Sequence, residues 1–300
     1  MSKFKNWVSA ARLRTLPLSV SGIIMGTALA DLAGFFDIGI FILALLTTLS
    51  LQVLSNFAND YGDGIKGTDN EHRVGPKRAL QSGAISNKQM KKGIVINSII
   101  CLCLAALLIY FSFTKEQLVF VFFFLVLGVL AVVAAIKYTV GKSAYGYAGL
   151  GDVFVFIFFG LVSVLGVKFL YHQDFSWFAV LPATTIGLLS TAVLNLNNIR
   201  DIENDRFSNK NTLVVKIGAE KALKYHFGII ITAFISFLIY LFLLKHPILF
   251  SSLIAFVPVF FHIKKVVNFT NPKQFDAELK VIALSTFLLS LLFMILVFIK

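Results

Sequence analysis

The chain has 300 residues, of which 58% are hydrophobic and 14% charged; its mean hydropathy is +0.85 and its formal net charge +12. Soluble domains carry about 25% charged residues, so this composition excludes an ordinary soluble domain, a disordered chain and a disulfide-stapled secreted domain. The 27 lysines and arginines lie between apolar segments rather than on one polar face, so no nucleic-acid partner is expected.

Nine apolar segments are long enough to cross a bilayer, which takes about 20 residues of helix. No Gly/Ser linker or polar domain separates them, which predicts one membrane domain over residues 1–300 and an all-α polytopic fold within the lipid bilayer. In chain order the expected helices cover residues 16–32, 38–57, 93–113, 117–136, 150–170, 178–198, 224–244, 247–264 and 280–299.

The basic residues are divided unequally between the two sides of such a bundle. With nine alternating spans, 23 of the 27 lysines and arginines fall on the side of the N-terminus and the long loops. Loops on the cytoplasmic side of a membrane carry an excess of these residues. We therefore expect a multi-pass protein of the inner (plasma) membrane, with the N-terminus and the long loops in the cytoplasm.

Acidic residues gather in two of these long polar regions, each of which contains the pattern Asn-x-x-x-Asp. Residues three or four positions apart share one face of a helix, so each region forms an acidic stripe. The first stripe comprises Asn56, Asp60 and Asp63, and the second comprises Asn197, Asp201 and Asp205.

Two acidic stripes at one membrane mouth would repel each other unless cations lay between them. Ligand sets made only of oxygen suit Mg²⁺, which in proteins often combines one or two carboxylates with substrate phosphates. The stripes therefore predict a diphosphate that Mg²⁺ bridges to both regions. The alternative interpretation is that these are solvated charges at helix ends.

Basic and amide side chains alternate with the acids and can complement phosphate oxygens. Arg73, Arg78 and Lys142 are the strongest basic candidates, because polar or glycine-rich segments surround them; for the lysines generally, setting the orientation in the membrane is the alternative. The candidate substrate-binding residues are Asn56, Asn59, Lys66, Arg73, Arg78, Tyr145, Asn197, Asn198, Arg200 and Lys210.

A third segment, residues 137–152, is rich in glycine and contains three tyrosines. This composition is typical of a shaped lid, and its aromatic rings could face an allylic carbocation, since π faces attract cations. Asp152 either caps the following helix or belongs to the site, and both interpretations stay open.

These motifs resemble the UbiA-type intramembrane prenyltransferase superfamily, which is marked by N-D-x-x-D and D-x-x-x-D motifs on nine helices around a central cavity. The matching segments here are Asn59–Asp63 and Asp201–Asp205. Further segments resemble the members of that superfamily that prenylate 1,4-dihydroxy-2-naphthoate in menaquinone synthesis: Asn59–Asp69, Arg73–Gln81, Tyr145–Gly160 and Asn197–Gly218.

The resemblance implies transfer of a polyprenyl chain from polyprenyl diphosphate to 1,4-dihydroxy-2-naphthoate, with loss of CO₂ and diphosphate, to give demethylmenaquinol. It implies Mg²⁺ as cofactor. The alternatives are 4-hydroxybenzoate or another aromatic acid as acceptor, or a membrane transporter, although a transporter would carry charges near helix midpoints. The implied Mg²⁺ ligands are Asp60, Asp63, Asp201 and Asp205, and the implied catalytic residues are Asp69, Lys142, Tyr138 and Asp152.

Two residues depart from the pattern of that superfamily. Asn209 stands where glycine is usual, and Ala144 stands where proline commonly precedes Tyr-Gly-Tyr. Because asparagine tolerates left-handed backbone, we expect Asn209 to preserve the turn. Asp69 lies beyond a Gly-Ile-Lys-Gly turn, so we expect it to be independent of the metal and to act as a general base, or else to cap the loop.

Overall fold

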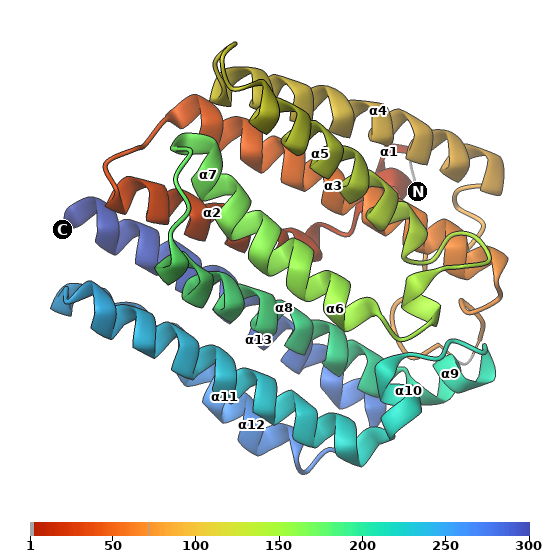
Figure 1. Cartoon of the computed structure of the whole chain (residues 1–300). Coiled ribbons are helices and arrows are strands. Elements are labelled where there is room, and N and C mark those ends of the chain that lie inside the picture. The colour runs from red at the N-terminus through yellow and green to blue at the C-terminus, as the bar shows by residue number, and fades with distance from the viewer. Residues whose placement is uncertain (1–2, 72) are drawn as a thin grey trace.

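The computed structural model describes residues 3–71 and 73–300, and within these ranges every regular element is helical (Figure 1). The described residues contain nine helices long and apolar enough to span a membrane, which confirms the expected number and class. The α-helices are α1 (Lys3–Ala11), α2 (Leu16–Leu32), α3 (Ile38–Ile65), α4 (Asn87–Ser112), α5 (Leu118–Lys137), α6 (Gly151–Val155), α7 (Val167–Tyr171), α8 (Val180–Arg200), α9 (Ile202–Phe207), α10 (Leu213–Ile217), α11 (Ala219–Leu244), α12 (Val257–Val266) and α13 (Phe275–Ile299).

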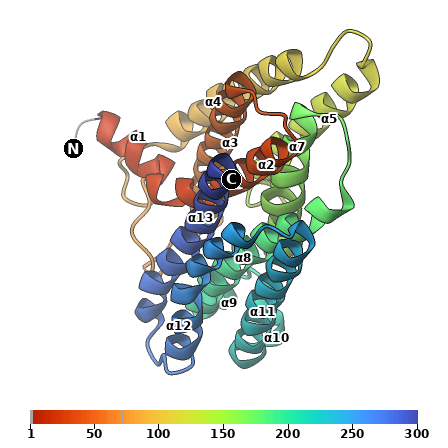
Figure 2. The same ribbon diagram turned by 90° about the vertical axis from the view of Figure 1, so that its left-hand side faces the viewer.

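Several spans combine more than one kind of helix. A π-helical segment, Phe156–Gly166, joins α6 to α7, and a 3₁₀ segment, Pro247–Phe256, leads into α12. At the start of the chain, the 3₁₀ turn Leu13–Thr15 separates α1 from α2. Figure 2 shows α1 projecting from the side of the bundle, so this first helix is set apart from the span that follows it.

Some spans, α3 and α4 among them, are longer than hydropathy predicts. α3 continues eight residues past the expected end at residue 57, and it stops where Gly67 adopts a φ of +74°, a conformation typical of helix ends. α4 begins at Asn87, because the Ser86 hydroxyl and the Gln89 side chain form a reciprocal N-terminal cap. The longer α3 therefore carries Asp60 and Asp63 within the helix itself.

Small residues let the central helices approach closely, as is common where membrane helices pack. Gly22 and Gly26 of α2 lie against Ser163 and Val164 of the π-helical segment. A methyl group on Gly160 would come within 2.6 Å of the Gly187 Cα atom on α8. α2 and α8 can therefore both pack directly on the span that contains α6 and α7.

We expect Gly160→Ala to destabilise the protein, because the added methyl group meets backbone atoms of α8 that cannot move aside. Overpacking of this kind costs about 1–3 kcal/mol, more than the helix propensity that alanine gains. Thermal unfolding in detergent micelles measures the change. Gly228→Ala is the control, since nothing lies within 4 Å of its added Cβ atom. An equal melting temperature for the two variants would contradict the close packing.

Candidate active site

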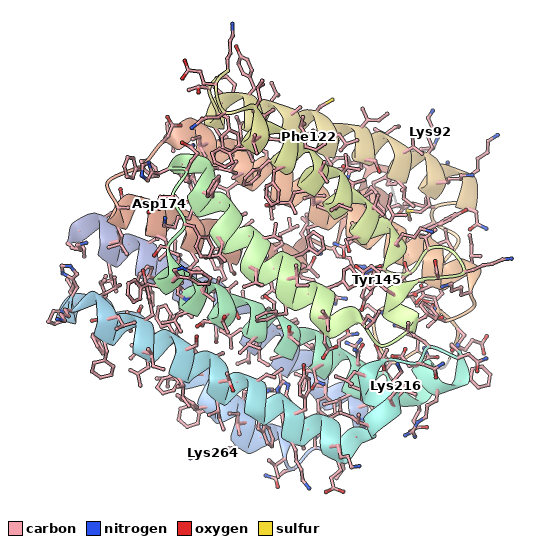
Figure 3. The ribbon with its side chains drawn as sticks, in the orientation of Figure 1. Lys92, Phe122, Tyr145, Asp174, Lys216 and Lys264 are labelled. Carbon is pink, nitrogen blue, oxygen red and sulfur yellow. The ribbon has the colours of Figure 1, made fainter. Side chains whose placement is uncertain are left out.

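Charged and hydroxyl side chains meet at one end of the bundle, which we call the polar end. It comprises the last turns of α3, the loops 66–86 and 138–150, and α9 with α10. Figure 3 shows Tyr145 and Lys216 at this end, and Asp174 at the opposite end.

The first acidic stripe lies buried on α3, and its members have different surroundings. Asn56, Asp60 and Asp63 are each at most 3% exposed. The Asn56 amide donates to the Ala11 carbonyl (2.8 Å) and to the Thr15 hydroxyl (3.1 Å). Asn56 therefore fastens the α1–α2 junction to α3, and its expected role in substrate binding stays a prediction.

Asp63 is held by two partners from other segments. Its Oδ2 atom accepts a hydrogen bond from Arg78 Nη1 (2.6 Å), and its Oδ1 atom accepts one from the Tyr147 hydroxyl (2.8 Å). Arg78 Nη1 also donates to the Asn59 carbonyl (2.9 Å). The guanidinium thus ties the loop after α3 back onto the acidic stripe.

Asp60 lies beside Asp63, but among the described residues no side chain donates a hydrogen bond to either of its carboxylate oxygens. The nearest positive charges belong to Arg12 and Arg78, and the backbone of Ala79 and Leu80 faces the carboxylate. Arg12 has a left-handed backbone (φ 51°), and its buried Nη2 atom has no partner. The sequence indicated Arg12 only as a cation that sets orientation; its place beside Asp60 depends on the turn between α1 and α2.

Asp69 forms an ion pair with each of two arginines. Its carboxylate, 1% exposed, lies 3.1 Å from Arg73 Nε and 3.1 Å from Arg78 Nη1, although neither donor is aligned for a hydrogen bond. Burial raises the pKa of Asp69 to about 6, while the charge of Arg78 acts against this shift. Burial also lowers the pKa of Arg73. Arg78 therefore joins Asp69 to Asp63, and the expected independence of Asp69 from the metal stays a prediction.

The second stripe is interrupted at its middle member. α8 ends at Arg200 and α9 begins at Ile202, so Asp201 lies at the junction. Both Asp201 oxygens accept hydrogen bonds from Arg200, at 2.9 and 2.6 Å, and the same guanidinium bonds to Asn197 Oδ1 and to Asp276 Oδ1 of α13. Arg200, supported by Asn197, therefore ties α8 to α13, and the expected contact of both residues with substrate stays a prediction.

Asp205 and Lys210 connect the second stripe to the first. Asp205 Oδ1 lies 3.4 Å from Lys210 Nζ, and its Oδ2 atom has no hydrogen-bond partner. Burial raises the pKa of Asp205 to about 6, with Lys210 opposing the shift. Burial would lower the pKa of Lys210, but the charges of Asp63 and Asp205 outweigh it and raise that pKa. Lys210 thus lies in the field of both stripes and reduces their mutual repulsion.

The tyrosine-rich loop forms an aromatic wall beside these charges. Tyr145 stacks on Phe154 with ring centroids 3.9 Å apart, and its edge meets Tyr138 at 5.3 Å. Burial raises the pKa of Tyr138 to about 12, which keeps this phenol neutral. Lys142 lies on the exposed part of the loop, away from the buried groups. The predicted turn at Asn209 is confirmed by its φ of +53°.

Asp152 is buried in the first turn of α6, where no side-chain hydrogen bond caps the helix. Its carboxylate faces the Tyr225 hydroxyl of α11, and its Oδ2 atom has no partner. The carboxylate also accepts a hydrogen bond from the Asp152 backbone in this first turn, so capping and a role in the site both stay predictions. Asn198 is also buried with a free amide oxygen.

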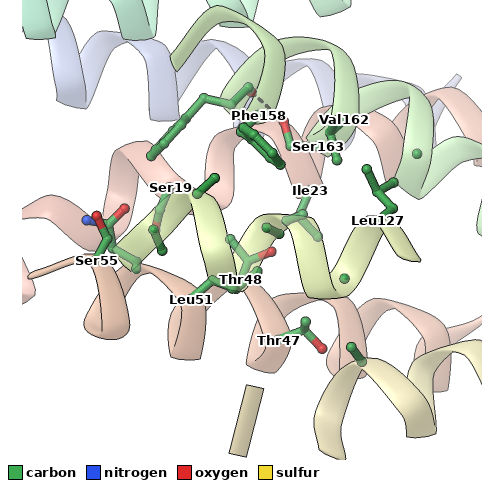
Figure 4. A pocket seen from close by; sticks show the side chains of 18 of the residues that line it. Ser19, Ile23, Thr47, Thr48, Leu51, Ser55, Leu127, Phe158, Val162 and Ser163 are labelled. Carbon is green, nitrogen blue, oxygen red and sulfur yellow. Dashed lines mark hydrogen bonds between the residues drawn. The ribbon is translucent and has the colours of Figure 1, made fainter. Parts of the chain in front are cut away.

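A cavity of about 350 Å³ runs between α2, α3, α4, α5 and the α6–α7 span (Figure 4). Its walls are mainly aliphatic and aromatic, with scattered hydroxyl groups such as Thr48 and Ser163. Asn59 and Tyr138 line the cavity, and both also adjoin the charged groups, since Asn59 accepts from Arg78 and Tyr138 lies in the field of Lys210. Among the described residues no charged side chain lines the cavity, but Asn59 and Tyr138 bring one end of it beside residues that hold the buried charges.

The donor set fits a hard divalent cation such as Mg²⁺ in its chemistry. Unpartnered buried oxygens belong to Asp60, Asp205, Asn198 and Asn204, and oxygen is the ligand that Mg²⁺ prefers. The described residues nevertheless contain no group of three or more His, Cys, Asp or Glu side chains arranged to hold a metal. The four predicted carboxylates are thus not gathered into one cluster, because Arg200 and Lys210 hold members of the second stripe.

The fold and the site together define a helical membrane protein whose apolar cavity leads to buried carboxylates and cations. Residues 19–291 match the UbiA prenyltransferase family, and the chain belongs to that family. It is 47% identical over 226 residues to the 1,4-dihydroxy-2-naphthoate octaprenyltransferase of Escherichia coli, covering 75% of this chain and 73% of the relative. It is 45% identical to the Haemophilus influenzae protein of the same name, over 82% and 84% of the two chains.

Solved structures share the fold at low sequence identity. A digeranylgeranylglyceryl phosphate synthase aligns over the whole of both chains with a TM-score of 0.61 and 20% identity. A UbiA homologue from Archaeoglobus fulgidus, bound to DMAPP and Mg²⁺, aligns over 96% of this chain and 97% of its own, with a TM-score of 0.61 and 16% identity. These similarities establish the arrangement of the nine spans.

We expect Arg78→Met to destabilise the protein by about 3 kcal/mol, because it leaves the buried Asp63 and Asp69 carboxylates without their shared cation. Unfolding in detergent micelles measures the change. Arg206→Met is the control: Arg206 pairs with Glu203, both side chains are largely exposed, and such pairs contribute about 0–1 kcal/mol. The pairing is refuted if both variants unfold at the same temperature.

Proposed function

We propose that this protein transfers a polyprenyl chain from polyprenyl diphosphate to 1,4-dihydroxy-2-naphthoate, with release of CO₂ and diphosphate. The observation that carries the proposal is the junction of the apolar cavity with the buried charges at Asn59 and Tyr138. A ligand with a long apolar tail and an anionic head fits such a junction. The names of the relatives from E. coli and H. influenzae support the same acceptor.

Cationic side chains at the polar end are suited to bind the anionic head. Among the described residues, Arg12 and Lys66 have no carboxylate within ion-pair distance, whereas Arg73, Arg78 and Lys210 are each paired with one or more acids. In our proposal Asp60 and Asp63, with Asp201 and Asp205 from the second stripe, hold Mg²⁺ there. When bound, Mg²⁺ withdraws charge from the diphosphate as a Lewis acid and so favours its departure.

In the proposed reaction the bond between the prenyl chain and the diphosphate breaks. The aromatic wall lies on the prenyl side of this bond. Tyr138 and Tyr145 line the cavity next to the carboxylates, and Tyr145 is held by its hydrogen bond to the Ala134 carbonyl (2.9 Å). Their π faces favour an allylic cation, and the dry walls exclude the water that would capture it. The acceptor ring then has access to the allylic carbon from the cavity.

We further propose that the polar end faces the cytoplasm and that the protein lies in the inner membrane. The excess of lysine and arginine in the loops at this end supports the orientation. Both substrates would then enter from the cytoplasmic face.

We expect the purified protein to form a prenylated naphthol from 1,4-dihydroxy-2-naphthoate and a polyprenyl diphosphate only when Mg²⁺ is present. Product formation is measured by chromatography, with 4-hydroxybenzoate as the competing acceptor. Asp60→Ala and Asp201→Ala should each lower turnover by more than about 100-fold, beyond the loss typical of residues that only support a metal ligand. Faster turnover of 4-hydroxybenzoate would refute the acceptor, and activity in chelator would refute the metal.

We propose that Asp69 acts on the acceptor rather than on the metal. Asp69→Asn should lower turnover by about 100-fold, the loss expected for a general base, because the amide cannot take a proton from a naphthol hydroxyl. Binding of the polyprenyl diphosphate with Mg²⁺, measured by calorimetry, should change little, since Arg73 and Arg78 both remain. A parallel loss of binding and turnover would instead make Asp69 part of the diphosphate site.

A further inference from the structure

Tyr147 occupies the point where three segments of the polar end meet. Its hydroxyl lies 2.8 Å from Asp63 Oδ1 at the end of α3 and 2.5 Å from Thr68 Oγ1 in the following loop. Its own segment is the tyrosine-rich loop, and its carbonyl accepts a hydrogen bond from the Asn211 amide (3.2 Å). Tyr147 thus connects α3 and the loop after it through its side chain, and the segment that follows Asp205 through its backbone carbonyl.

The direction of these hydrogen bonds follows from the groups involved. An ionised carboxylate only accepts, so the Tyr147 hydroxyl donates its single proton to Asp63. Thr68, which is buried, must then donate its proton to the Tyr147 oxygen. The chain of donation runs from Thr68 through Tyr147 to Asp63, and each bond polarises the next. The Tyr147 hydroxyl thus fixes Asp63 Oδ1, while Arg78 fixes Asp63 Oδ2.

The ring of Tyr147 holds two lysines. Lys66 Nζ lies 3.7 Å from the ring centroid and Lys210 Nζ lies 5.8 Å from it, both within the range of a cation–π contact. Lys66 has no carboxylate within ion-pair distance among the described residues, so the ring is its main partner. The ring therefore positions one cation from each acidic region.

Backbone contacts brace the same junction. Asn204 donates to the Thr68 carbonyl (2.9 Å), and Lys216 Nζ donates to the Ala148 carbonyl (2.6 Å). Tyr147 is thus held between α9, α10 and the loop after α3, and the positions of its hydroxyl and ring are fixed.

We propose that Tyr147 is a positioning residue with two separable functions: its hydroxyl orients the Asp63 carboxylate, and its ring places Lys66 and Lys210 against the anionic head of the substrate. The proposal rests on the proposed function, because it assigns Tyr147 to the diphosphate site. The hydroxyl serves the carboxylate that receives Mg²⁺, and the ring serves the cations that receive phosphate oxygens.

The two functions predict different effects for two substitutions, measured by calorimetric binding of inorganic diphosphate over a range of Mg²⁺ concentrations. Tyr147→Phe keeps the ring and should raise the Mg²⁺ concentration needed for binding about tenfold, the loss expected for one hydrogen bond to a charged group. Tyr147→Leu also removes the ring and should lower diphosphate affinity a further ~3-fold at saturating Mg²⁺, in line with a lost cation–π contact.

The matched control is Tyr171→Phe, which removes another tyrosine–threonine hydroxyl pair, to Thr27 (3.0 Å), at the opposite end of the bundle. It should leave both binding curves unchanged. Melting temperatures in detergent identify loss of fold, and Tyr147→Phe, which keeps the packing of the ring, carries the test if Tyr147→Leu does not fold.

The outcomes separate this inference from the proposed function. A wild-type protein that fails to bind diphosphate with Mg²⁺ would overturn both. A wild-type protein that binds, together with two Tyr147 variants that bind equally well, would overturn the positioning role alone. A Tyr147→Phe variant that weakens binding equally at all Mg²⁺ concentrations would overturn the separate function of the hydroxyl.

Discussion

Buried carboxylates lie close together at the polar end because Arg78 and Lys210 lie between them. Arg78 Nη1 is 2.6 Å from Asp63 and 3.1 Å from Asp69, and Lys210 Nζ is 3.4 Å from Asp205. Unpaired carboxylates in a low-dielectric environment would cost several kcal/mol each. The loop after α3 folds back so that Arg78 contacts the carboxylates of α3, and the loop after α9 does the same for Lys210 and Asp205. The geometry of the whole polar end depends on these two contacts.

The same pairing explains why some acids keep free oxygens. Asp63 and Asp201 have partners on both oxygens, whereas Asp60 and one oxygen of Asp205 have none. Unsatisfied buried polar atoms are rare in folded proteins and call for a ligand or ion. In the proposed function, a cation and a diphosphate bind at these oxygens and complete the electrostatics of the polar end.

Helix packing forms the apolar cavity that adjoins the charged polar end. The glycines of α2, α8 and the π-helical segment allow close approach at Gly22, Gly160 and Gly187, while the cavity lies between α2, α3, α4, α5 and the α6–α7 span. A protein that belongs to the UbiA prenyltransferase family thus combines a tightly packed group of central helices with an open apolar channel. In the proposed function, the charged head and the apolar tail of one substrate meet these two different kinds of packing.

The sequence by itself determined the nine spans, the family and the two acidic motifs, because hydropathy and helix periodicity are local properties of the chain. It did not determine the partner of each side chain. Asn56 and Arg200 are polar residues in or beside the acidic motifs, as Asp60 is, so the sequence does not distinguish them. In the structure, however, Asn56 and Arg200 hold helices together.

Contacts between distant residues were decided only by the tertiary structure. Tyr147 and Asp63 are 84 positions apart, and the buried His226 and His262, 36 positions apart, bring their Nε2 atoms within 2.9 Å. Such contacts depend on how the helices pack and on which rotamer each side chain adopts. No local pattern encodes either, because both are set by the free energy of the assembled bundle.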